Sequence, residues 1–178
     1  QSAGAVPVAH YKSANTDVLT RVIAKISSKS PAQHIEDIAD AVGYEGAFFI
    51  SLSPEGYPAF SGGGCLSARD LARFGLIFTR QGRNIAGQPF ANNEFLSKTI
   101  SRDAPQLSEP KGWLRYSNHL MTDGRFVGHA GYGGQFLLID TKRKTSISFL
   151  SVLENEDGYD DAYMGKVAVT LKNVLQQF

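Results

Sequence analysis

Apolar residues recur at helical spacing in five stretches of the chain, most of them bounded by residues that start or stop helices. In the clearest case, Ser30 and Gln33 form a capping box around Pro31. Gly43 ends that helix, and Ser67 opens another one in the same way. Counted from cap to stop, the predicted helices cover residues 17–28, 30–43, 67–82, 93–100 and 160–178.

Five further stretches predict strands, because they combine apolar, aromatic and β-branched residues between turn-forming segments. They cover residues 47–52, 113–120, 125–129, 135–140 and 145–152. Residues 122–124 and 141–144 have the chemistry of hairpin turns. We therefore expect the last four strands to form an antiparallel meander with the C-terminal helix packed on one face. Helices followed by strands and a final helix predict an α+β fold rather than an alternating parallel sheet.

Composition and charge narrow the choice of partners. The 178 residues are 42% hydrophobic and 20% charged, which is typical of a globular domain and not of a disordered chain. Lys and Arg number 18 against 17 Asp and Glu, and the densest basic run, residues 142–144, lies in a predicted turn. A nucleic-acid partner is therefore not expected. No apolar run approaches the roughly 20 residues of a membrane span, so no membrane span is expected either.

The sequence predicts neither a metal site nor a disulfide. Cys65 is the only cysteine, which excludes an intrachain disulfide and a thiolate metal cluster. The four histidines are His10, His34, His119 and His129, and no two of them have the i,i+4 spacing of helical metal ligands.

Two glycine clusters, residues 62–64 and 131–134, fit neither a phosphate loop nor a dinucleotide fingerprint. The second is followed by a strand and not by a helix whose N-terminus would hold phosphate, so no cofactor is expected. Glycines beside an edge strand instead let a ligand approach the backbone, whose N–H groups can stabilise an oxyanion. The alternative interpretation is a glycine-rich hairpin with a satisfied His129 beside it.

Three segments taken together carry a family resemblance. Tyr11 lies on a loop just before an amphipathic helix, and residues 62–75 read GGGCLSARDLARFG. The strand with His129-Ala130-Gly131 then precedes a hairpin and a terminal helix. This order, over nearly all of the chain, resembles the serine β-lactamase and penicillin-binding-protein superfamily. It is most similar to the class C-like branch that includes esterases and 6-aminohexanoate-dimer hydrolases.

The resemblance implies an antiparallel sheet flanked by helices, and acyl-enzyme chemistry on an amide, ester or β-lactam. Tyr11 matches the tyrosine of the second catalytic motif, which helps to move the proton. Its phenol, with a free pKa of ~10, needs a cationic lysine nearby to act as a base or relay. Ser13 stands where the family has asparagine, and as a hydrogen-bond donor it is a candidate substrate-binding residue.

The resemblance also assigns the strand of the third motif. His129 and Gly131 match its two ends and would bind substrate, with Gly133 beyond them. Tyr132, next along the strand, would give its backbone N–H to the oxyanion hole, where one donor contributes ~3–4 kcal/mol.

The nucleophile motif of the family, Ser-x-x-Lys at the start of a helix, has one literal match, residues 108–111. This match follows Tyr11 in the chain, contains Pro110, and lies in a loop already broken by Pro105, with no apolar period behind it. We therefore expect residues 1–178 to be the C-terminal portion of one β-lactamase-like domain, incomplete at its N-terminal side. The nucleophilic serine and the first strands would lie outside this chain.

Besides a small amide, ester or β-lactam substrate, the expected partner is the missing N-terminal segment or another copy. Either would cover apolar residues of the terminal helix such as Val167, Val169 and Leu171. A second interpretation is a non-catalytic ligand-binding or sensor domain with the same fold, and a third is an unrelated α+β domain. A Ser-x-x-Lys motif upstream of Tyr11 would favour the enzyme.

Overall fold

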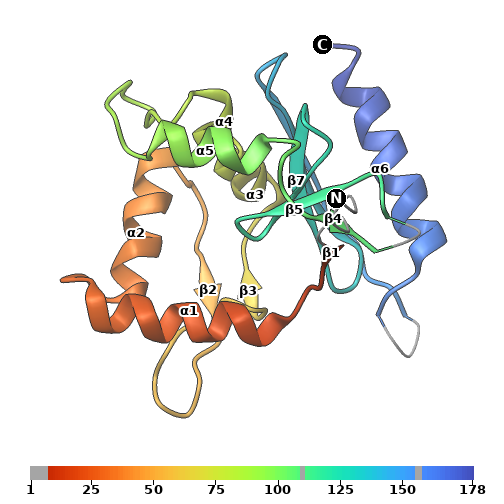
Figure 1. Cartoon of the computed structure of the whole chain (residues 1–178). Coiled ribbons are helices and arrows are strands. Elements are labelled where there is room, and N and C mark those ends of the chain that lie inside the picture. The colour runs from red at the N-terminus through yellow and green to blue at the C-terminus, as the bar shows by residue number, and fades with distance from the viewer. Residues whose placement is uncertain (1–7, 109–110, 155–157) are drawn as a thin grey trace, which may run out of the picture.

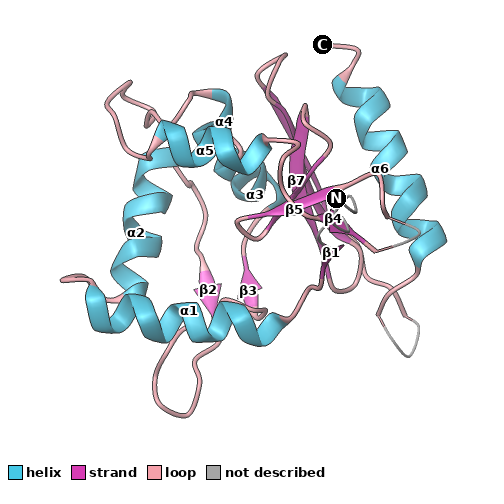
Figure 2. Ribbon diagram, in the orientation of Figure 1, coloured by secondary structure: helices cyan, strands magenta, loops and turns pink. Residues whose placement is uncertain are grey.

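Seven strands form one sheet in the computed structural model, which describes residues 8–108, 111–154 and 158–178 (Figure 1, Figure 2). The order across the sheet is β1-β4-β5-β6-β7-β8-β9. The strands are β1 (Val8–Ala9), β4 (Gln106–Leu107), β5 (Arg115–Ser117), β6 (Leu120–Thr122), β7 (Phe126–Gly131), β8 (Gln135–Asp140) and β9 (Thr145–Phe149). β1 is parallel to β4, and the other neighbouring pairs are antiparallel. A separate antiparallel ribbon consists of β2 (Phe49–Ile50) and β3 (Gly64–Cys65).

The helices of the described ranges cover both faces of the sheet (Figure 1). They are α1 (Ser13–Ile26), α2 (Pro31–Val42), α3 (Ala68–Phe74), α4 (Leu76–Thr79), α5 (Asn93–Ile100) and α6 (Asp161–Leu175). Successive side chains of β8 point to opposite faces and so belong to two apolar clusters. Leu137 and Ile139 pack with residues of α4 and α5, whereas Phe136 packs with residues of α6. The predicted α+β fold, with an antiparallel sheet flanked by helices, is confirmed.

The predicted meander is confirmed, but it has five strands and not four. Residues 113–120, predicted as one strand, divide into β5 and β6 around a tight turn at Asn118 and His119. Both turn residues have left-handed backbone conformations, with φ of 49° and 61°. Asn118 Nδ2 donates to Thr99 Oγ1 on α5 over 2.8 Å, which holds the turn in place. The strands predicted at 47–52 and 145–152 are shorter in the structure, where only β2 and β9 remain.

Two predicted helices also differ from the structure. α1 begins at Ser13 and not near Asp17, and its N-cap residue, Lys12, makes no side-chain capping bond. The helix predicted for 67–82 is divided into α3 and α4 at Gly75. A Cβ at Gly75 would lie 2.2 Å from Ser146 Oγ, so glycine is required where this helix pair approaches β9.

The capping box of Ser30 and Gln33 and the left-handed stop at Gly43, with φ of 71°, are confirmed for α2. Within the described residues, no helix combines the length and the apolar character that crossing a membrane requires.

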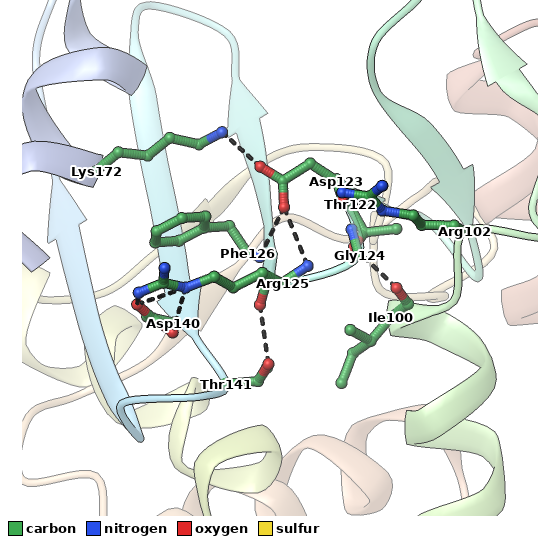
Figure 3. Close-up of polar contacts among 10 residues, drawn as sticks. All are labelled: Ile100, Arg102, Thr122, Asp123, Gly124, Arg125, Phe126, Asp140, Thr141 and Lys172. Atoms are coloured by element: carbon green, nitrogen blue, oxygen red, sulfur yellow. Dashed lines mark hydrogen bonds and ion pairs between the residues drawn. The ribbon is translucent and has the colours of Figure 1, made fainter. Parts of the chain in front are cut away.

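The turn between β6 and β7 ties the sheet to helices on both of its faces (Figure 3). Asp123 accepts hydrogen bonds from the N–H groups of Arg125 (3.1 Å) and Phe126 (2.9 Å). The same carboxylate pairs with Lys172 of α6 over 2.6 Å. Thr122 Oγ1 donates to the carbonyl oxygen of Ile100 at the end of α5 over 3.1 Å. These bonds fix the start of β7, the strand that carries His129.

Candidate active site

The short parallel pair of β1 and β4 places Tyr11 beside the sheet. Val8 pairs with Gln106 and Ala9 with Leu107, and the chain passes Tyr11 before α1 begins. Tyr11 is 45% exposed. Pairing between two-residue strands distant in the sequence is thus what positions the predicted proton-transfer residue.

The structure brings Tyr11, Ser13 and His129 together, although His129 lies on β7. The centroids of the Tyr11 and His129 rings are 5.8 Å apart. Ser13, the first residue of α1, donates from Oγ to Tyr11 Oη over 3.3 Å. The Ser13 hydroxyl is thus placed beside the oxygen that the resemblance assigns to proton transfer.

His129 is held as a neutral ring. Its Nδ1 lies 2.7 Å from the carbonyl oxygen of Ala130. Because a carbonyl oxygen only accepts, Nδ1 carries the proton and Nε2 keeps its lone pair. Burial lowers the pKa of His129, and the nearby His119 lowers it further, against the hydrogen bond to Ala130. At neutral pH this strand therefore presents an uncharged hydrogen-bond acceptor at His129.

Two further rings belong to this cluster, and neither was predicted from the sequence. Tyr116 of β5 lies with its ring centroid 6.0 Å from Tyr11 and 6.2 Å from His129, in edge-on contacts. His119, on the β5–β6 turn, lies 6.3 Å from Tyr116. Its Nδ1 is 3.3 Å from Thr16 Oγ1 on α1. The signal that reveals them is the Asn-His turn, because it folds the segment after Tyr116 back toward β7.

The glycine cluster of the third motif forms the β7–β8 turn. β7 ends at Gly131, so Tyr132 lies in the turn and not on the strand as predicted. The Tyr132 side chain is 76% exposed, and a Cβ at Gly158 would lie 2.2 Å from its ring. Gly133 has a φ of 76°, which glycine adopts without strain, and its N–H donates to the carbonyl oxygen of Gly158 over 2.8 Å. The Gly133 N–H is therefore already bonded within the protein. Gly131 is the last residue of β7.

In the literal Ser-x-x-Lys match neither Ser108 nor Lys111 belongs to a helix, and the lysine is paired with another group. Ser108 follows β4, and its carbonyl oxygen accepts from the N–H of Lys111 over 3.0 Å, as in a turn. Lys111 Nζ pairs with Asp161 of α6 over 2.7 Å and contacts the hydroxyl of Tyr159. Residues 109–110 of this segment lie outside the described part of the chain.

The described residues include no group of three or more His, Cys, Asp or Glu side chains that could hold a metal ion. A small cavity of about 70 Å³ lies between the sheet and α6, and the polar residues of its wall are Asp123, His129 and Lys172. Asp123 and Lys172 pair with each other, and His129 already belongs to the ring cluster around Tyr11. The ring cluster around Tyr11 is the better candidate site.

The sequence model of the beta-lactamase family matches residues 4–169. The chain belongs to the beta-lactamase family. One similar solved structure is a protein assigned as a 6-aminohexanoate-dimer hydrolase, from Bacillus anthracis, with a TM-score of 0.76 and 22% sequence identity. The alignment covers 98% of this chain and 45% of that one.

A second similar structure is a protein assigned as a beta-lactamase, from Bacteroides dorei DSM 17855, with a TM-score of 0.72 and 14% identity. The alignment covers 96% of this chain and 59% of that one. No curated protein is significantly similar to this chain in sequence. The predicted family and fold are thus confirmed, and the chain spans about half the length of the solved relatives that it matches.

Proposed function

We propose that this chain forms part of a serine hydrolase that cleaves an amide, ester or β-lactam through an acyl-enzyme. The observation that carries the proposal is the meeting of Tyr11, Ser13 and His129 in a member of the beta-lactamase family. The nucleophilic serine would lie outside residues 1–178; this is supported by the place of Ser108 and Lys111 outside any helix and by the pairing of Lys111 with Asp161. A non-catalytic ligand-binding domain with this fold is the alternative that the experiment below separates.

In this proposal Tyr11 moves the proton between the nucleophile and the leaving group. A phenol with a free pKa of ~10 is a poor base at neutral pH, so a lysine ammonium from the missing motif would hold it ionised. Ser13 would assist by donating to the phenol oxygen, as it does here. The backbone N–H of Tyr132 would stabilise the oxyanion of the tetrahedral intermediate.

His129 would contribute to substrate binding and not to proton transfer. Its Nδ1 is engaged by Ala130, so only the Nε2 lone pair is available to a ligand. A substrate group that donates a hydrogen bond, such as an amide N–H, would fit this acceptor. A neutral ring would attract a substrate carboxylate far less than a lysine would.

The test is to treat the complete protein with a fluorophosphonate probe and with a fluorescent penicillin, and to map adducts by mass spectrometry. We expect a stoichiometric adduct on a serine outside residues 1–178, and no adduct when these residues are expressed alone, since acylation needs a nucleophile beside its base. An adduct on Ser13 or Ser108 would refute this assignment. Saturable binding of an ester or amide without any adduct would instead favour the ligand-binding domain.

Gly131 offers a second test of the same cleft. A Cβ at this position would lie 3.3 Å from Gln135 Cβ, a contact that a small shift relieves, and its φ is not left-handed. Gly131→Val should therefore leave the circular dichroism spectrum near normal while its branched side chain blocks the substrate path. We expect KM to rise about tenfold or more, since small displacements of substrate are costly.

The matched control for this variant is Gly62→Val, because a Cβ at Gly62 meets nothing within 4 Å. This control should leave both KM and the spectrum unchanged. Loss of the fold in Gly131→Val would favour a purely structural hairpin at this position.

A further inference from the structure

The hydroxyl of Tyr116 is buried, and among the described residues it has no hydrogen-bond partner. Buried polar groups in folded proteins are nearly always bonded, so an unbonded one calls for an explanation. The side chain belongs to β5, whose N–H at Tyr116 bonds to the carbonyl oxygen of Pro105 over 2.9 Å. The backbone is therefore held firmly, and it is the hydroxyl alone that lacks a partner.

Three rings surround Tyr116, and two of them have one ring nitrogen already engaged. His129 uses Nδ1 toward Ala130, and His119 has Nδ1 beside Thr16. The third ring is Tyr11, in an edge-on contact with an interplanar angle of 85°. Burial and the charge of Tyr11 raise the pKa of Tyr116 to about 12. Tyr116 therefore keeps its proton in the pH range where Tyr11 would work, and the two phenols interact electrostatically.

We propose that Tyr116 is a positioning residue of the acyl-transfer site, whose hydroxyl donates a hydrogen bond to Tyr11 when Tyr11 becomes a phenolate. The proton of Tyr11 leaves for its acceptor in the reaction, while Tyr116 retains its own. A donor held beside the phenolate stabilises the charged form and so lowers the pKa of Tyr11. This inference rests on the proposed function only where it assigns the proton transfer to Tyr11.

The other polar groups near Tyr11 differ from Tyr116 in their contacts or in their exposure. Ser13 of α1 donates to the Tyr11 hydroxyl, and His129 of β7 faces the ring as a neutral group. His10 and Lys12, on the segment before α1, are exposed to solvent. Among the ring neighbours of Tyr11, Tyr116 is thus the phenol donor without a competing partner in the described structure.

The test is Tyr116→Phe in the complete protein, with tyrosines labelled at the ring carbon that bears the hydroxyl. Nuclear magnetic resonance then follows the ionisation of Tyr11, whose signal is identified by its loss in Tyr11→Phe. We expect the pKa of Tyr11 to rise by about one unit, and the acidic limb of kcat/KM to move by the same amount. At neutral pH kcat/KM should fall about tenfold. Thermal stability should stay the same or increase, because an unbonded buried hydroxyl is removed.

The matched control is Tyr44→Phe. Tyr44 is another phenol whose pKa is raised to about 12, there by burial and by the charge of Asp70. Tyr44 packs against the apolar cluster that contains Val42 and is not one of the rings around Tyr116. Tyr44→Phe should therefore alter neither the titration of Tyr11 nor the pH profile. A Tyr116→Phe protein with an unchanged Tyr11 titration and pH profile would overturn the inference.

A second variant keeps the inference testable if Tyr116→Phe does not fold. Tyr116→3-fluorotyrosine preserves the ring and makes the hydroxyl a stronger donor, so it should lower the pKa of Tyr11; an unchanged titration would again count against the pairing. The titration does not depend on turnover. If Tyr116→Phe shifts the titration in a protein that forms no acyl-enzyme, the phenol pair is upheld and the proposed function fails.

Discussion

Tyr11→Phe is expected to reduce the acylation rate of the complete protein at least ~100-fold, the lower end of what general acid–base catalysis contributes. The variant removes the oxygen that accepts from Ser13 and would carry the proton. The fold should change little, because one hydroxyl contributes ~1 kcal/mol and this side chain is 45% exposed. Single-turnover acylation and thermal unfolding measure the two effects separately.

A control for this experiment is Tyr57→Phe. The Tyr57 ring lies under the guanidinium of Arg21, further along α1, so this variant also removes a phenol hydroxyl near that helix. It should acylate at the normal rate. Equal rates for Tyr11→Phe and the unaltered protein would take Tyr11 out of the mechanism.

The parts of the fold that were predictable are those encoded by neighbouring residues. α2 is bounded by a capping box at Ser30 and a left-handed glycine at Gly43, and both signals act within one turn of the helix. β8 was predicted to the residue because turn-forming segments flank its apolar run. Turn-forming residues at 122–124, before β7, and at 141–144, after β8, likewise predicted the meander.

What escaped prediction depends on contacts between distant segments. β1 and β4 have two residues each, too few to show any periodicity, and their pairing is fixed only in the folded sheet. α1 begins at Ser13 without a capping side chain, so tertiary packing and not a local signal sets its start. The left-handed turn at Asn118 and His119 was included in a single strand, because Asn-His lacks the glycine of the usual two-residue hairpin signals.

The residues of the candidate site also differ in whether the sequence alone could reveal them. Tyr11 and His129 were found from the order of motifs, which a resemblance conveys without any knowledge of contacts. Tyr116 could not be found in this way, since its place in the site depends on the turn that folds β6 against β5. Its unbonded hydroxyl is visible only once the side chains around it are placed.

Asp140, the last residue of β8, joins the β6–β7 hairpin, whose strand β7 carries His129, to the β8–β9 hairpin (Figure 3). Its carboxylate is fully buried and accepts from Arg125 Nε at 3.1 and 3.2 Å. The N–H groups of Lys142 and Arg143 add bonds of 3.0 and 3.1 Å from the β8–β9 turn. Burial acts to raise the pKa of Asp140, but the bonds from Arg125 and from the turn outweigh it and lower that pKa.

Asp140→Asn is therefore expected to lower the free energy of unfolding at pH 7 by about 2 kcal/mol. This is less than the ~3–5 kcal/mol for breaking a fully buried pair, because Arg125 stays 35% exposed and regains water. With a lowered native pKa, the ionised carboxylate contributes its full stabilisation above the unfolded value of ~3.9 and loses it as pH falls through the native value.

Urea unfolding of the original chain and of Asp140→Asn, in the complete protein, should thus give curves that converge as pH is lowered below about 4. Glu94→Gln is the control, since Glu94 and Lys98 form an exposed pair on α5 and such pairs contribute at most ~0.5 kcal/mol. A difference for Asp140→Asn that is no larger than that of Glu94→Gln, or that does not shrink in acid, would show that the buried carboxylate does not hold the two hairpins together.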